Sequence, residues 1–86
     1  MLPSAFSLKP TQIKNSRELG ALIRAFRKNQ HLTLETVSGM TNVSMRFLSE
    51  LERGKETAEL GKALAILNQL GLKIIITSRG TSDECV

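Results

Sequence analysis

The sequence predicts a small all-α domain of four to five helices, followed by one short β-strand. Apolar residues recur at helical spacing in separate stretches between residues 15 and 70, and typical capping residues stand between these stretches. After Gly71 the pattern changes to a β-branched run over residues 72–77. A chain of 86 residues is expected to build only one hydrophobic core.

The first expected elements are an extended arm over residues 1–14, which holds both prolines, and a helix that follows it. Asn15 and Glu18 stand three residues apart, as in a capping box, so the helix is expected to begin there. One apolar stripe then follows at positions i, i+3, i+4 and i+7: Leu19, Leu22, Ile23 and Phe26.

Two short helices are expected next. Thr33 is suited to cap the second helix, and Gly39 and then Asn42 are expected to interrupt it, because Asn tolerates the left-handed conformation that ends helices. Ser44 is suited to cap a third helix over residues 45–52. The sequence therefore predicts two helices joined by a tight turn.

A fourth helix is expected from about Ala58 to Leu70, with Gly71 placed to end it. The expected strand lies within residues 72–78, and the polar residues 79–86 are expected to fray. A lone strand cannot satisfy its own backbone groups, so we expect it to pair with the same strand of a second copy. The alternative is a ladder within the chain, formed with residues 5–8 of the arm.

Basic residues outnumber acidic ones, twelve to eight, which gives a formal net charge of +4. Six of the basic residues fall between positions 9 and 28, against the single acid Glu18: Lys9, Lys14, Arg17, Arg24, Arg27 and Lys28. This distribution favours an anionic partner.

Several functional classes are disfavoured by composition. The single cysteine, Cys85, rules out an intrachain disulfide, and His31 is the only histidine, so no metal site or cofactor is expected. No phosphate-binding glycine loop or nucleophile elbow is present, so we do not expect an enzyme. With no export leader and no apolar run near 18 residues, we expect a cytoplasmic protein that does not enter membranes.

Two short helices joined by a tight turn are the plan of a helix-turn-helix. The stretch from Leu32 to Lys55 resembles the helix-turn-helix of the Xre/Cro/C1-type repressor family, most specifically in its LERGK ending, residues 51–55. The resemblance covers about residues 15–71 and implies a lambda-repressor-like DNA-binding domain. Three positions depart from the family pattern: Ser38 replaces the usual Ala, Asn42 the turn Gly, and Leu34 a frequent Gln that contacts phosphate.

The resemblance assigns base reading to the third helix, at Met45, Arg46 and Glu50, with Phe47 and Ser49 adjacent. Arg46 is suited to guanine, Glu50 to the cytosine amine, and the apolar side chains to the thymine methyl. Two simpler interpretations stay open here. Arg46 is a solvated helix residue in one of them, and Phe47 is a core residue in the other.

Phosphate contacts are expected from the two capping residues and from the basic residues after the third helix: Thr33, Ser44, Arg53 and Lys55. The resemblance also places Glu52 opposite Arg27, as a partly buried ion pair that ties the first helix to the third. We expect the loss of one partner to cost on the order of 3 kcal/mol.

Residues 52–76, which include the fourth helix and the strand, resemble HipB-type antitoxins. In these proteins the strand pairs across the dimer, which here implicates Leu72, Ile74, Ile75 and Ile76. The resemblance implies a homodimeric repressor of palindromic operators that binds and inhibits a HipA-type serine/threonine kinase toxin. A stand-alone or phage-type Xre-family regulator and an interaction module that no longer reads DNA are the alternatives.

Overall fold

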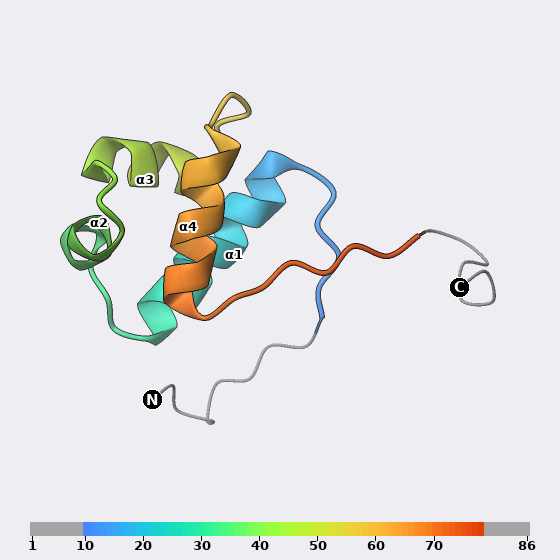
Figure 1. The fold of residues 1–86 in the computed structure, drawn as a ribbon, viewed down its shortest axis with the longest axis horizontal. Helices are drawn as coiled ribbons and strands as arrows, with labels where there is room; N and C mark the ends of the chain where they lie inside the picture. The colour runs from blue at the N-terminus through green and yellow to red at the C-terminus, as the bar shows by residue number, and fades with distance from the viewer. Residues whose placement is uncertain (1–9, 79–86) are drawn as a thin grey trace.

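The computed structural model describes residues 10–78, so the expectations for residues 1–9 and 79–86, including the ladder with residues 5–8, lie outside the described part. The described chain forms four α-helices, and the predicted all-α helix-turn-helix fold is confirmed. Figure 1 shows the helices in one bundle, which the chain leaves after the last helix as an extended trace. The helices are α1 (Ser16–Asn29), α2 (Leu34–Thr41), α3 (Met45–Glu52) and α4 (Leu60–Leu70).

The first three helices begin at the predicted capping residues. The side chains of Asn15, Thr33 and Ser44 accept hydrogen bonds from backbone N–H groups three residues ahead, over 2.8, 3.0 and 3.0 Å. Each cap satisfies one of the amides that a helix start leaves without a partner. The capping box differs in one detail, because the Glu18 carboxylate accepts from the backbone N–H of Lys14 instead of that of Asn15.

Two helix bounds differ from the sequence expectation. The helix α2 continues through Gly39 and ends only at Asn42, which adopts the left-handed conformation with φ 61°. The helix α4 begins at Leu60 instead of about Ala58, and its N-cap Glu59 makes no capping hydrogen bond with its side chain. Gly71, with φ 89°, ends α4 as predicted.

The core draws on all four helices. Its largest fully buried side chains are Ile23, Val37, Leu48, Ile66 and Leu70. The helix α1 packs against α3 and α4, and α2 packs against α3 and α4. This packing leaves the outer face of α3 on the surface. Every helix within residues 10–78 is too short or too polar to traverse a lipid bilayer.

The helices α1 and α3 approach each other closely at Gly20. A Cβ atom at this position would lie 2.3 Å from the carbonyl oxygen of Leu51 and 2.6 Å from that of Glu52. Only glycine allows the two backbones to come this close. The sequence around Gly20 contains no local pattern that predicts this contact.

The chain after α4 has no assigned strand within the described residues. Leu72 turns back to the bundle, where its backbone N–H donates to the Leu67 carbonyl over 2.9 Å and its side chain packs against the core. Beyond it, Ile74, Ile75 and Ile76 are exposed. Pairing of this segment with a second copy therefore stays a prediction.

Candidate nucleic-acid interface

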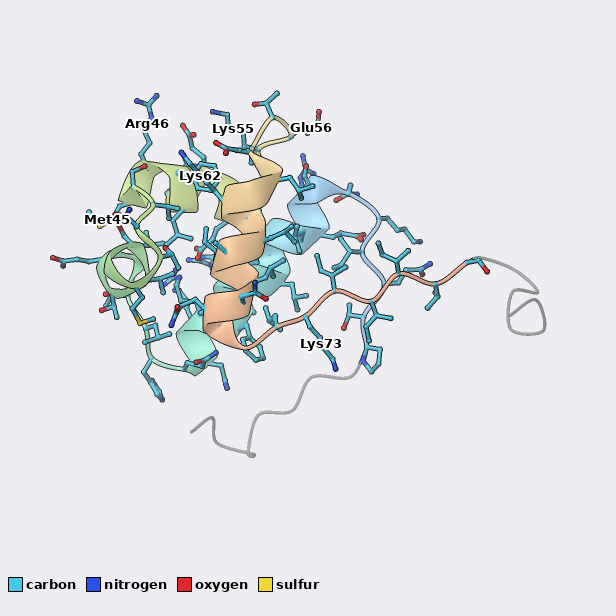
Figure 2. The ribbon with its side chains drawn as sticks, viewed as in Figure 1. Met45, Arg46, Lys55, Glu56, Lys62 and Lys73 are labelled. Carbon is cyan, nitrogen blue, oxygen red and sulfur yellow. The ribbon has the colours of Figure 1, made fainter. Side chains whose placement is uncertain are left out.

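The N-terminal turn of α3 presents two of the predicted base-reading residues to solvent. The Met45 residue is 49% exposed and the Arg46 side chain is 87% exposed. Figure 2 shows Arg46 projecting from α3, away from the other helices. An exposed methionine at a helix start is available for contact with a partner, since it contributes nothing to the core of its own chain.

Glu50, one turn after Arg46, accepts from two cations. Its Oε2 lies 3.2 Å from Arg46 Nε, and its Oε1 lies 3.0 Å from Lys55 Nζ. The hydrogen bond from Lys55 lowers the pKa of Glu50 from its usual value, and the hydrogen bond from Arg46 is the second largest cause of this shift. The carboxylate therefore links the start of α3 to the loop that follows α3.

Phe47 lies on the inner side of this surface, and Ser49 is partly exposed on α3. Phe47 is half-buried and packs against the core, while Lys62 of α4 places its ammonium group 5.4 Å from the centre of the ring. Of the two interpretations of Phe47, this position favours the core residue. The Ser49 hydroxyl accepts from Arg53 Nη1 over 3.1 Å.

The capping residues Thr33 and Ser44 are both exposed and mark the N-termini of α2 and α3. Their side-chain oxygens already accept from helix amides, and the Thr33 hydroxyl also lies 2.9 Å from that of Thr36. The positive end of each helix dipole therefore faces solvent near α3, which suits a phosphate group.

Arg27 and Glu52 form the ion pair that the resemblance implied. Arg27 Nε and Nη2 donate to the two carboxylate oxygens of Glu52 over 2.6 and 3.0 Å, and both side chains are buried. Arg27 Nη1 donates to the carbonyl of Leu32 over 2.7 Å. The hydrogen bond with Glu52 raises the pKa of Arg27, although burial opposes this effect. One guanidinium thus fixes α1 to α3 and to the loop before α2.

Beside α3 lies an open groove that α1 forms with the beginning of α2 and the end of α3. Arg24 and Lys28 of α1 and Arg53 after α3 line this groove, together with Thr33 and Ser49. Within residues 10–78, Arg24 and Lys28 form no ion pair. Although Glu35 also lines the groove, its unpaired cations leave an excess of positive charge next to α3.

Sequence reasoning missed Arg24 and Lys28 as candidate site residues. Their spacing of four residues places them on one face of α1, and they belong to the basic stretch between positions 9 and 28. This signal was present in the sequence. What could not be read from it was that the same face borders α3.

The comparison with family models decides the family. The HTH_3 model, described as helix-turn-helix, matches residues 23–75, which include α2, the turn and α3. The chain belongs to the Xre/Cro/C1-type helix-turn-helix family.

Relatives of this helix-turn-helix chain are transcriptional regulators and not enzymes. An uncharacterized HTH-type transcriptional regulator, y4mF of Sinorhizobium fredii, is 42% identical over 80% of the chain and 91% of the relative. The transcriptional regulator ClgR of Mycobacterium tuberculosis is 36% identical over 72% of the chain, which spans 57% of that relative. The chain is accordingly a helix-turn-helix transcriptional regulator of the Xre family.

Solved structures support the same fold. HipB in its O4 20mer complex matches with a TM-score of 0.75 at 16% identity, over 81% of this chain and 99% of HipB. A chain of the HipA–HipB–O2–O3 complex matches with a TM-score of 0.76 at 16% identity, over 81% and 99%. At this identity the likeness shows the fold alone. ClgR from C. glutamicum matches with a TM-score of 0.62 at 31% identity, over 72% and 80%.

Proposed function

We propose that the chain is a repressor that binds a palindromic DNA operator as a homodimer. The observation that carries this proposal is that Arg46 is exposed on α3 beside a groove in which three cations have no acidic partner among residues 10–78, namely Arg24, Lys28 and Arg53. Base edges specify a DNA site, and phosphate contacts position the protein on it. The surface supplies groups for both tasks.

In this proposal Met45 and Arg46 contact base edges, with Arg46 donating two hydrogen bonds to a guanine. Phosphate groups are bound at the N-termini of α2 and α3 and by the cations around them. Five residues carry these contacts: Arg24, Lys28, Thr33, Ser44 and Arg53, while Lys55 is held by the carboxylate of Glu50. Phe47 supports the surface from within, and Ser49 lines the groove beside α3.

The second copy is needed because the segment after α4 exposes a β-branched run. Ile74, Ile75 and Ile76 are 53%, 67% and 91% exposed, an unusual state for three consecutive isoleucines. We propose that residues 72–78 pair with the same residues of a second copy, with Leu72 anchoring the segment to its own core. A two-fold axis there would place the two α3 helices one DNA turn apart, roughly 34 Å.

We further propose, as the finer function, that the protein is the antitoxin of a HipA-type serine/threonine kinase. Support comes from the likeness to HipB, including a chain from the HipA–HipB–O2–O3 complex. The alternative is a regulator without a toxin, which the higher sequence identity to ClgR favours. Co-expression with a kinase-like product of the neighbouring gene separates the two. Copurification and loss of kinase activity support the antitoxin, and a neighbourhood without a kinase gene contradicts it.

The test of DNA binding is selection of a duplex from a random pool, followed by affinity measurements on that duplex and on a shuffled duplex at several salt concentrations. We expect a palindromic preference and a steep loss of affinity with salt, because bound phosphates release counterions. The Arg46→Ala variant should lose about 1–3 kcal/mol of binding free energy on the selected duplex, and its base preference at one position should weaken. Absence of any binding would support an interaction module instead.

A further inference from the structure

The carboxylate of Glu50 is not free to accept a hydrogen bond from a base. Each of its oxygens accepts from one cation, Oε2 from Arg46 Nε and Oε1 from Lys55 Nζ. Only 22% of the Glu50 side chain is exposed, against 87% of the Arg46 side chain. A cytosine amine at this position would have to compete with two charge-assisted hydrogen bonds.

The same contacts orient Arg46. Glu50 accepts from Nε, and the two terminal nitrogens of the Arg46 guanidinium make no hydrogen bond within residues 10–78. A guanine presents two acceptors, O6 and N7, to a pair of such donors. Holding Nε limits the conformations of a long side chain before DNA arrives, and less conformational entropy is then lost on binding.

We propose that Glu50 is a positioning residue that sets sequence discrimination by holding Arg46 and Lys55, and that it does not itself read a base. This inference rests on the proposed DNA-binding function. On DNA without the correct guanine, Arg46 and Lys55 can reach phosphates only by leaving the carboxylate or by bringing a phosphate near it. Both routes weaken binding to non-cognate DNA. At the cognate site Arg46 keeps its contact with Glu50 while its terminal nitrogens bind guanine.

The test is the Glu50→Gln variant, which keeps the size of the side chain and removes its charge. The probes are the duplex that the wild-type chain selects and a shuffled duplex of equal length, each titrated against salt. Glu59→Gln is the matched control, because Glu59 is also an acid near a lysine, Lys62, at 3.6 Å. The control removes the same charge from the chain without touching Arg46.

We expect Glu50→Gln to bind the shuffled duplex about three- to tenfold more tightly at 0.1 M salt, with a steeper salt dependence, because one or two cations become free for phosphates. Preference for guanine at the Arg46 position should fall, and preferences at other positions should remain. In an Arg46→Ala background the substitution should no longer change base preference. Glu59→Gln should resemble the wild-type chain in all these measurements.

Two results would overturn the inference. In one, Glu50→Gln exchanges a cytosine preference for another base at its own position and leaves binding to the shuffled duplex unchanged. In the other, Glu50→Gln behaves like Glu59→Gln throughout. If the wild-type chain itself binds no duplex, the proposed function fails, which is distinct from either result.

Discussion

The residues of the Arg27–Glu52 pair show how a single buried contact supports the exposed surface. The guanidinium uses Nε and Nη2 for Glu52 and Nη1 for the Leu32 carbonyl, so that α1, α3 and the loop before α2 meet at one side chain. Removing one member leaves the other charged and desolvated, which costs more than the pair contributed. The pair stabilises the fold, although it lines the same groove as the proposed phosphate contacts.

We expect Arg27→Ala to lower the free energy of unfolding by about 3 kcal/mol, because the Glu52 carboxylate would stay buried without its partner. Urea denaturation followed by circular dichroism measures this change. The double variant Arg27→Met with Glu52→Leu should recover a large part of the loss. A double variant no more stable than Arg27→Ala would contradict the explanation.

We expect Gly20→Ala to lower the free energy of unfolding by about 2 kcal/mol, because its Cβ would meet the Leu51 carbonyl oxygen of α3. The matched control is Gly39→Ala, in the interior of α2, where nothing lies within 4 Å of an added Cβ. This control should gain about 0.5–1 kcal/mol from helix propensity. Equal thermal stability of the two variants would show that α1 and α3 do not approach as described.

At the scale of elements, the sequence predicted the starts of three helices because caps are local. Asn15, Thr33 and Ser44 each satisfy an amide three residues ahead, so the neighbouring sequence contains all the required information. The start of α4 was placed less well, since Glu59 provides no such cap. The groove and the close approach at Gly20 depend on how α1 lies against α3, which no local pattern specifies.

The turn between α2 and α3 explains two departures from the family pattern. The Ser38 hydroxyl donates to the Val43 carbonyl across the turn, which an alanine could not do. Asn42 adopts the left-handed conformation that the usual glycine would adopt. Both residues therefore stabilise the turn between the two helices.

We expect Asn42→Ala to lower the free energy of unfolding by about 1 kcal/mol, because alanine is strained at a φ of 61°. Asn42→Gly should be neutral or slightly stabilising. Thermal unfolding of the three proteins compares them directly. Unfolding temperatures that rank Ala above Gly would refute the role assigned to this backbone conformation.

At the scale of the whole molecule, a core drawn from four short helices is small, and small domains bury a modest share of their surface. The exposed isoleucines after α4 offer additional apolar area to a second copy. The β-branched pattern of residues 72–77 predicted from the sequence alone that this segment pairs with a second copy. The sequence did not show that Leu72 packs against the core of its own chain, since this contact is a tertiary feature.

We expect the double variant Ile74→Lys with Ile76→Lys to be monomeric, because two charges on one face of the paired segment would repel their counterparts across the two-fold axis. Sedimentation equilibrium measures the mass. Lys73→Ala, in the same segment, is the control and should remain dimeric. A dimeric Ile74/Ile76 variant would show that the second copy binds elsewhere.

The most direct measurement of the central claim is binding to a series of duplexes that carry two selected half-sites at centre-to-centre spacings from about 8 to 13 base pairs. A homodimeric repressor should bind with two chains per duplex and with an affinity maximum near one helical turn. The Arg46→Ala variant should lose affinity most at that spacing. One chain per duplex, with an affinity that does not depend on spacing, would contradict binding as a homodimer.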